Sequence, residues 1–176
     1  MFPNWFKDVE HYFKHVPQVP IRALQIGTYT GDATQWLLNN REIEFIHDVD
    51  TWEGSDEPIH STLNFSSVEE YYDSRFKDVN QLTKHKMTSD KFFSTNTSSY
   101  NFIYIDGDHT ALQTALDGLN AFRMLEVGGV IAFDDYEWRN GSAFLEPKLG
   151  VDAFLSICND KIKLLEREYQ VWAQKC

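Results

Sequence analysis

Four aspartates stand directly after two apolar segments, and carboxylates grouped in this way can bind a metal ion. Asp106 and Asp108 follow the run NFIYI, and Asp134 and Asp135 follow the run VIAF. If the two runs are adjacent parallel strands, the four side chains meet at one edge of a sheet, where like charges raise one another's pKa. Mg²⁺, which binds carboxylate oxygens in proteins, would remove that penalty. Two simpler roles stay open: a helix N-cap for Asp108, and solvated loop positions for Asp134 and Asp135.

His109 comes directly after Asp108 and is expected at the same edge. An imidazole with a pKa near neutrality can accept a proton from a hydroxyl group, so His109 is a candidate general base. His11 and His15 have the spacing of two metal ligands on one helix face, but no carboxylate or third ligand accompanies them. We therefore interpret that pair as part of a solvated helix face.

A glycine-containing turn follows the first apolar strand segment. In the run GTYTG, Gly27 would end a strand and Gly31 would precede a helix, so the backbone can turn tightly and approach a ligand. The dinucleotide fingerprint G-x-G-x-x-G needs further glycines at the positions of Tyr29 and Asp32, which disfavours NAD. The chain also lacks the G-K-[ST] sequence of a P-loop.

An aspartate at the end of the second strand is placed to bind a sugar hydroxyl. Asp50 lies 23 positions after Gly27, a spacing at which an acidic residue contacts the ribose of a nucleotide-like cofactor. Asp48 lies two residues earlier on the same strand face, so both aspartates are candidates for this role.

The order of segments predicts the sheet that would bring these residues together. Apolar runs typical of strands alternate with segments of helical periodicity, and two short β-like runs close the chain. This pattern predicts an α/β fold, Rossmann-like and doubly wound, with a mostly parallel seven-stranded sheet and an antiparallel C-terminal hairpin. The expected strands cover residues 22–26, 43–50, 83–88, 101–105, 130–133, 162–165 and 169–173. The expected helices cover residues 5–16, 33–38, 68–76, 90–93, 110–125 and 151–158, with Gly128 and Gly129 ending the fifth.

Composition indicates one compact domain. The chain has 176 residues, of which 42% are hydrophobic and 24% charged, as is typical of a globular core. Its net charge of −11 argues against a nucleic-acid binder, whose affinity depends on clustered cations. No apolar run approaches the length needed to span a bilayer, and the first residues lack the pattern of a secretory signal.

Two cysteines, Cys158 and Cys176, form neither a disulfide framework nor a metal-binding spacing. We expect a cytoplasmic domain over residues 1–176 that acts on a small molecule and has no nucleic-acid or membrane partner. A homo-oligomer stays open.

Four motifs together resemble a known enzyme family. They are RALQIGTYTGDAT, the D-x-D-T-W-E-G-S run, FIYIDGDH and VGGVIAFDDY, which lie within residues 21–141. The sequence resembles the class I S-adenosylmethionine-dependent methyltransferases, and is most similar to the small O-methyltransferases of the catechol, caffeoyl-CoA and macrolide-sugar types.

The resemblance implies roles for individual residues. Gly27, Thr28 and Gly31 would hold the methionine part of the cofactor, Asp50 its ribose, Thr88 and Ser89 its adenine, and Asp108 its amino end. Asp106, Asp134 and Asp135 fall at the metal ligands of the metal-dependent members, and His109 falls where the catechol and caffeoyl-CoA types place a catalytic lysine. The resemblance therefore implies S-adenosyl-L-methionine and Mg²⁺ as cofactors, with Asp106 and His109 as the catalytic pair.

The chain departs from the family at Gln25, where an acidic residue is usual. Only the N-terminal helix within residues 1–20 and the segment 51–80 could form an acceptor pocket or lid. We expect Mg²⁺-assisted methylation of a small-molecule hydroxyl, on a sugar or a phenol. Two alternatives stay open: a metal-independent methyltransferase whose aspartates bind cofactor and cap helices, and a non-catalytic cofactor-binding module that acts as a partner subunit.

Overall fold

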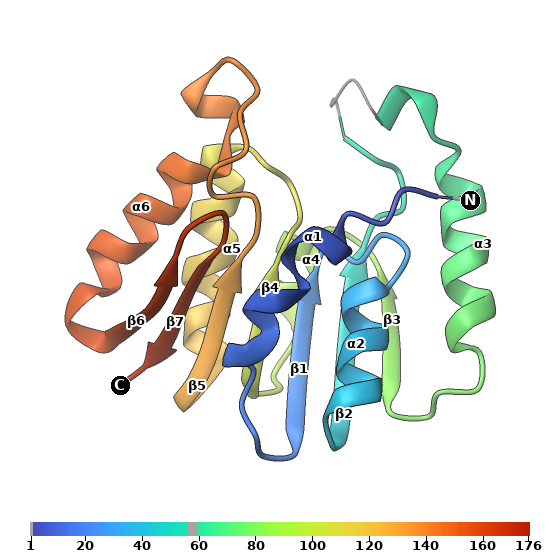
Figure 1. The fold of residues 1–176 in the computed structure, drawn as a ribbon, viewed down its shortest axis with the longest axis horizontal. Helices are drawn as coiled ribbons and strands as arrows, with labels where there is room; N and C mark the ends of the chain where they lie inside the picture. Colours follow the sequence, from blue (N-terminus) through green and yellow to red (C-terminus); the bar gives the residue numbers. More distant parts are fainter. Residues whose placement is uncertain (1, 56–59) are drawn as a thin grey trace.

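One seven-stranded sheet organises the chain. The structure, a computed structural model, describes residues 2–55 and 60–176, and its strands lie in the order β3-β2-β1-β4-β5-β7-β6 (Figure 1). Neighbours from β3 to β5 are parallel, whereas β7 is antiparallel to both β5 and β6. This confirms the predicted fold class. The strands are β1 (Ile21–Ile26), β2 (Ile43–Asp50), β3 (Leu82–Lys86), β4 (Tyr100–Ile105), β5 (Leu125–Phe133), β6 (Ile162–Arg167) and β7 (Val171–Lys175).

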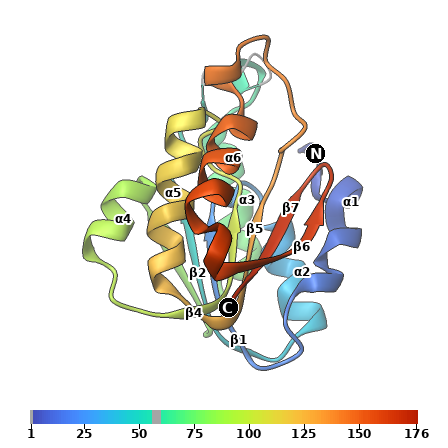
Figure 2. The same ribbon diagram turned by 90° about the vertical axis from the view of Figure 1, so that its left-hand side faces the viewer.

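Helices cover both faces of the sheet, as Figure 2 shows edge-on. They are α1 (Phe6–Val9), α2 (Asp32–Asn40), α3 (Phe65–Phe76), α4 (Ser89–Thr95), α5 (Ala111–Met124) and α6 (Pro147–Cys158). Short 3₁₀ helices are η1 (Glu10–His15), η2 (His60–Thr62), η3 (Ala143–Leu145) and η4 (Asn159–Lys161). None of the helices in the described part of the chain combines the length and apolar character needed to span a bilayer.

The sheet has a hydrophobic core on each face. Phe122 of α5 and Phe154 of α6 pack with Phe133 of β5 on one face. On the other face, Phe13 of η1 packs against Trp172 of β7. All six residues of β4 are buried, as predicted for an apolar run at the centre of a doubly covered sheet.

Two local predictions were wrong. The N-terminal helix is not one α-helix over residues 5–16, because α1 ends at Val9 and η1 follows. Tyr12 is buried three residues after Val9 and Val16 three residues after Phe13, which matches the three residues per turn of a 3₁₀ helix.

The second wrong prediction is that Gly128 and Gly129 end the fifth helix. That helix, α5, ends at Met124, and β5 begins at Leu125. The two glycines lie inside β5, in the irregular part of its pairing with β4, so they accommodate a bend in the strand.

Candidate active site

A large cavity lies beyond the carboxyl ends of the parallel strands. A cavity of about 1270 Å³ is lined by residues that follow β1, β2, β3, β4 and β5 and by residues of the N-terminal segment. It lies where the strand order reverses between β1 and β4, the position at which open α/β sheets bind ligands. In Figure 1 the strand arrowheads of β1 and β5 point toward this end of the molecule.

Gly27 allows the loops after β1 and β4 to pack closely. Its φ is +79°, and a Cβ at this position would lie 1.8 Å from the backbone oxygen of Asp106. The amide of Asp106 in turn donates to the carbonyl of Ile26. Because position 27 is a glycine, Asp106 can lie next to the first loop, where any other residue would collide with it.

Asp50 holds the first loop in place from inside the cavity. One of its carboxylate oxygens accepts hydrogen bonds from the backbone amides of Thr28 (2.7 Å) and Tyr29 (2.8 Å), and the other accepts from the amide of Trp52 (2.7 Å). Asp50 lines the cavity, and the oxygen that accepts only from Trp52 retains an acceptor site for a ligand hydroxyl. This geometry suits the ribose role predicted for it.

Asp48 does not line the cavity, although the sequence left it as a rival of Asp50. It is fully buried and accepts hydrogen bonds from Gln25 (2.9 Å), Thr34 (2.7 Å) and Tyr72 (2.8 Å). Burial raises the pKa of Asp48 to about 6. Gln25, the departure from the family pattern, therefore supplies an amide that satisfies this buried carboxyl group.

The other predicted cofactor residues are divided between the cavity and its supports. Thr28, Thr88, Ser89 and Asp108 line the cavity. The Thr28 hydroxyl is buried and has no hydrogen-bond partner within the described residues, which leaves it available to a ligand. Gly31 does not line the cavity: a Cβ there would meet the ring of Phe76 in α3.

Asp108 does not itself cap the helix after it. Its carboxylate accepts from the amide of Thr110 (2.7 Å), and Thr110 is the N-cap of α5. Thr88 likewise caps α4, and the Ser89 hydroxyl accepts a hydrogen bond from Gln113 of α5.

Asp106, His109 and Asp135 form a group that could hold a metal ion. Each offers one ligand atom, and these atoms lie within 4.8 Å of one another. His109 Nε2 is 3.2 Å from a carboxylate oxygen of Asp135 and 3.6 Å from one of Asp106. Burial and the charge of Asp134 raise the pKa of Asp106 well above its usual range. Carboxylate oxygens suit Mg²⁺ and Mn²⁺, and an imidazole nitrogen adds affinity for transition ions.

Asp134 lies beside this group but is engaged by other side chains. It accepts hydrogen bonds from the Tyr104 hydroxyl, from Gln170 Nε2 (3.0 Å) and from the amide of Asp135 (2.7 Å). Burial and the charge of Asp135 raise the pKa of Asp134 to about 6. The geometry thus favours His109 as the third ligand where the sequence pointed to Asp134.

Residues from the C-terminal hairpin complete the site, and sequence reasoning missed them. The Tyr169 hydroxyl donates to Asp135 (2.6 Å), while Gln170 binds Asp134. Burial and Asp135 raise the pKa of the Tyr169 hydroxyl. These residues carry no motif of their own, and only the antiparallel pairing of β7 with β5 brings them to the aspartates.

The charge of the cavity lining is one-sided. We call the acidic residues that line it the cavity aspartates: Asp8, Asp32, Asp50, Asp90, Asp106, Asp108, Asp134 and Asp135. Among the described residues, no lysine or arginine lines the cavity. Aromatic side chains form much of the remaining wall, namely Trp5, Phe6, Tyr12, Tyr29, Phe65, Tyr104, Trp138 and Tyr169.

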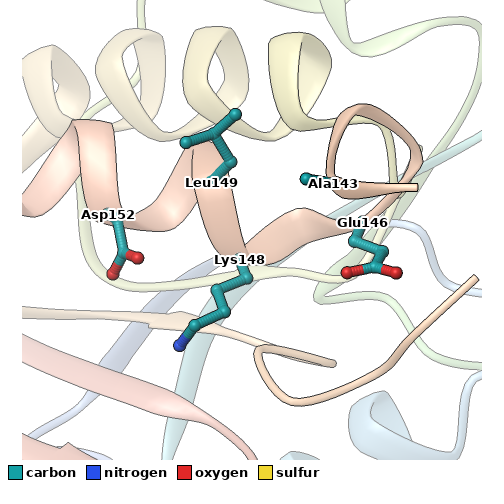
Figure 3. A pocket seen from close by; sticks show the side chains of 5 residues that line it. All are labelled: Ala143, Glu146, Lys148, Leu149 and Asp152. Carbon is teal, nitrogen blue, oxygen red and sulfur yellow. The ribbon is translucent and has the colours of Figure 1, made fainter. Parts of the chain in front are cut away.

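A second, smaller pocket lies on the surface between η3 and α6 and is lined by Ala143, Glu146, Lys148, Leu149 and Asp152 (Figure 3). Its volume is about 170 Å³. Leu149 extends toward α5 in Figure 3, whereas Lys148 points away from it. Lys148 lies over the Tyr136 ring and pairs with Glu137, and Glu146 accepts from the amide of Asn140. The charged groups are thus engaged within the protein, and we assign the chemistry to the large cavity.

Comparisons with known proteins identify the family of this domain. A family model described as a methyltransferase domain matches residues 24–136. None of the curated proteins matches the sequence.

Solved structures of methyltransferases share the fold. The N-methyltransferase NodS from Bradyrhizobium japonicum WM9 is 14% identical, covers 99% of both chains and has a TM-score of 0.65. An O-methyltransferase from Bacillus cereus in complex with SAH (S-adenosylhomocysteine) is 14% identical over 89% of this chain and 74% of that one, with a TM-score of 0.61. Fibrillarin from Aeropyrum pernix, with natively bound S-adenosyl-L-methionine, is 12% identical over 89% and 67% of the two chains, with a TM-score of 0.59.

The family match covers most of the chain and contains the first loop, Asp50 and the carboxyl ends of β4 and β5. Structural relatives carry S-adenosylmethionine or its product in the same fold. The chain therefore belongs to the class I S-adenosylmethionine-dependent methyltransferases.

Proposed function

We propose that this methyltransferase methylates a hydroxyl group of a small molecule with the assistance of a divalent metal ion. The observation that carries the proposal is the grouping of Asp106, His109 and Asp135 inside the cofactor cavity. The two carboxylates suit Mg²⁺ or Mn²⁺, and the imidazole adds affinity for a transition ion such as Mn²⁺. A metal ion held there would acidify the acceptor hydroxyl and fix its position.

The protein contributes mainly alignment to this reaction. Asp50 and the Thr28 hydroxyl would hold the ribose and methionine parts of the cofactor, because both line the cavity with free acceptor or donor capacity. Methyl transfer is an in-line displacement, and correct orientation of two reactants is worth about 7–11 kcal/mol.

We further infer that the N-terminal segment and residues after β2 form the acceptor side of the cavity. Trp5, Asp8 and Tyr12 line it from the N-terminal segment, and Ser55 and Phe65 line it from the predicted segment 51–80. Residues 56–59 of that segment lie outside the described residues.

A second candidate is metal-independent transfer, and the contact between His109 and Asp135 favours it. At 3.2 Å, the Asp135 carboxylate can orient the His109 imidazole. It can also stabilise the imidazolium that forms when His109 takes the proton of the substrate hydroxyl. A positioned base of this kind contributes about 10²–10⁴-fold to a rate.

The deciding experiment measures conversion of S-adenosylmethionine to S-adenosylhomocysteine with catechol and hexose acceptors, in Mg²⁺, in Mn²⁺ and in EDTA. Loss of turnover in EDTA supports the metal-assisted reaction. Loss of turnover in Asp106→Asn with unchanged S-adenosylhomocysteine affinity supports it independently. Asp160→Asn is the matched control, since this exposed aspartate does not line the cavity. Turnover retained in EDTA would favour the metal-independent candidate, and cofactor binding without any turnover would favour a non-catalytic binding module.

A further inference from the structure

The charges around the cavity restrict what can enter it. Eight aspartates line it, and no lysine or arginine does among the described residues. The five residues outside the described ranges include neither type. An anionic ligand would therefore meet a strongly negative potential with no side-chain cation to bind it.

Two arginines lie close to the cavity wall but are engaged elsewhere. Arg75 binds Asp32 (2.7 Å) and the Thr30 carbonyl. Arg139 follows the lining residue Trp138, but its guanidinium binds Glu137 (2.7 Å) outside the cavity. Neither group is oriented to receive an anion from the cavity.

The cofactor and a metal ion account for only part of the negative charge. S-adenosylmethionine carries one net positive charge and a divalent ion carries two, which together offset fewer than half of the seven cavity aspartates other than Asp32, which pairs with Arg75. Asp8 lies on α1 in the N-terminal segment, outside the loops after the strands that carry the residues proposed to hold the cofactor and the metal ion. The side chain is exposed, and no ion pair among the described residues includes it.

An aromatic pair that includes a residue from the same helical turn as Asp8 lines the cavity. Trp5 belongs to the same helical turn, since the Asp8 amide donates to the Trp5 carbonyl (3.1 Å). The Trp5 and Tyr29 rings lie 5.0 Å apart, tilted by 35°, and both line the cavity. Trp5 is 45% exposed although it packs against Tyr29. A carboxylate next to aromatic faces is an arrangement that binds organic cations.

We propose that the methyl acceptor is a small hydroxyl compound that carries a protonated amine, and that Asp8, Trp5 and Tyr29 bind this amine. The inference rests on the proposed function, because it names the acceptor class of the same cavity. In the reaction, an electron pair of the acceptor oxygen forms the new bond to the methyl carbon as the carbon–sulfur bond breaks. S-adenosylhomocysteine leaves as a neutral thioether, and the hydroxyl proton passes to a base or to solvent.

The same charges exclude other acceptors. Phosphorylated sugars, CoA thioesters and nucleic acids would bring their phosphates against the cavity aspartates. Phenols that bear a carboxylate would bring one negative charge against the same aspartates. Specificity in this cavity thus comes from repulsion of anions as well as from attraction of cations.

The first test compares acceptors that differ only in charge. Dopamine, 4-ethylcatechol and 3,4-dihydroxyphenylacetate share one ring and are cationic, neutral and anionic. Glucosamine, glucose and glucuronate repeat the series on a sugar. Calorimetry with the full-length protein, loaded with S-adenosylhomocysteine and Mg²⁺, should show at least tenfold tighter binding of one series' cation than of its neutral partner, with the anion weakest. Equal affinities within both series, including failure of every compound to bind, would overturn the inference.

The second test removes the proposed amine partner. Asp8→Asn should lower the affinity of the preferred cation about tenfold and leave that of the neutral compound unchanged. Asp160→Asn, an exposed control outside the cavity, should change neither. Higher salt should weaken binding of the cation alone, because salt screens charge–charge attraction. An unchanged preference in Asp8→Asn would overturn the assignment of Asp8.

Turnover separates this inference from the proposed function. Selective binding of the cation without methylation would support the charge selection and contradict O-methylation. Equal or faster methylation of neutral or anionic acceptors would support O-methylation and overturn the charge selection.

Discussion

Gln170 and Asp134 are joined by a 3.0 Å hydrogen bond from the Gln170 amide nitrogen to a carboxylate oxygen. The same amide nitrogen donates to the Tyr104 hydroxyl (3.0 Å), and the Trp172 indole donates to the side-chain oxygen Oε1 of Gln170 (2.8 Å). Gln170 is fully buried. This side chain ties the C-terminal hairpin to Asp134, which directly follows β5.

Gln170→Leu should destabilise the protein strongly. It leaves the Trp172 indole without a partner and removes one of the two hydrogen bonds to Asp134 Oδ1, and a buried polar group left unsatisfied costs about 1–3 kcal/mol. Urea unfolding measures the loss. Gln174→Leu in the following strand β7 is the control, because the hydrogen bond of Gln174 to the Gly128 carbonyl is exposed. Equal losses in the two variants would contradict the role given to Gln170.

Tyr169→Phe should weaken metal binding. The Tyr169 hydroxyl donates to Asp135 (2.6 Å), and removing a residue that orients a metal ligand typically costs 10–100-fold in affinity. Titration with Mn²⁺ by calorimetry checks this, and unfolding in urea shows whether the fold is retained. Tyr71→Phe is the control, since Tyr71 is exposed on α3 and does not line the cavity. Unchanged Mn²⁺ affinity in Tyr169→Phe would argue against Asp135 as a ligand.

Gly27→Ala should abolish S-adenosylhomocysteine binding and destabilise the fold. A Cβ at Gly27 would collide with the Asp106 carbonyl in addition to requiring a positive φ. Gly141→Ala isolates the second cost, because Gly141 has a φ of +76° and open space where its Cβ would lie. That backbone cost is about 1–2 kcal/mol. Calorimetry measures cofactor binding and urea unfolding measures stability in both variants. Equal losses in Gly27→Ala and Gly141→Ala would refute the steric role of Gly27.

Asp48 should make stability fall as the pH rises from about 4 to 6. Its pKa is about 6 in the folded protein, against an ordinary value of 3.8, so the folded state binds the proton more tightly. This contribution is fully present below the ordinary pKa and is lost as the pH passes through the folded value. The shift corresponds to about 3 kcal/mol at 1.36 kcal/mol per unit.

The matched variant isolates this effect from other buried carboxyl groups. Asp48→Asn cannot ionise, so the wild type should be more stable relative to this variant at pH 4 than at pH 8. Urea unfolding at the two pH values measures the difference. A difference independent of pH would show that burial of Asp48 does not penalise its charge.

Local patterns in the chain were sufficient to predict the seven-stranded sheet, its hairpin and most helices. The β2 run IEFIHDVD was predicted at the residues it occupies, and the α5 periodicity was displaced by only a residue at each end. Such patterns report which faces are buried, and burial in a doubly covered sheet follows from them directly. The placement of Gly27, Asp50 and Asp106 at strand ends followed from the same alternation.

Other features depended on contacts between segments far apart in the chain. Asp48 and Asp50 share a strand face, and the choice between them depended on Gln25, Thr34 and Tyr72 packing around Asp48. Asp134 is engaged by a hydrogen bond from Gln170, which lies 36 residues later, and this is one reason why the structure favours His109 over Asp134 as a metal ligand. The negative cavity is likewise a sum over many segments. No local pattern encodes these outcomes, because each one depends on where a partner side chain lies in three dimensions.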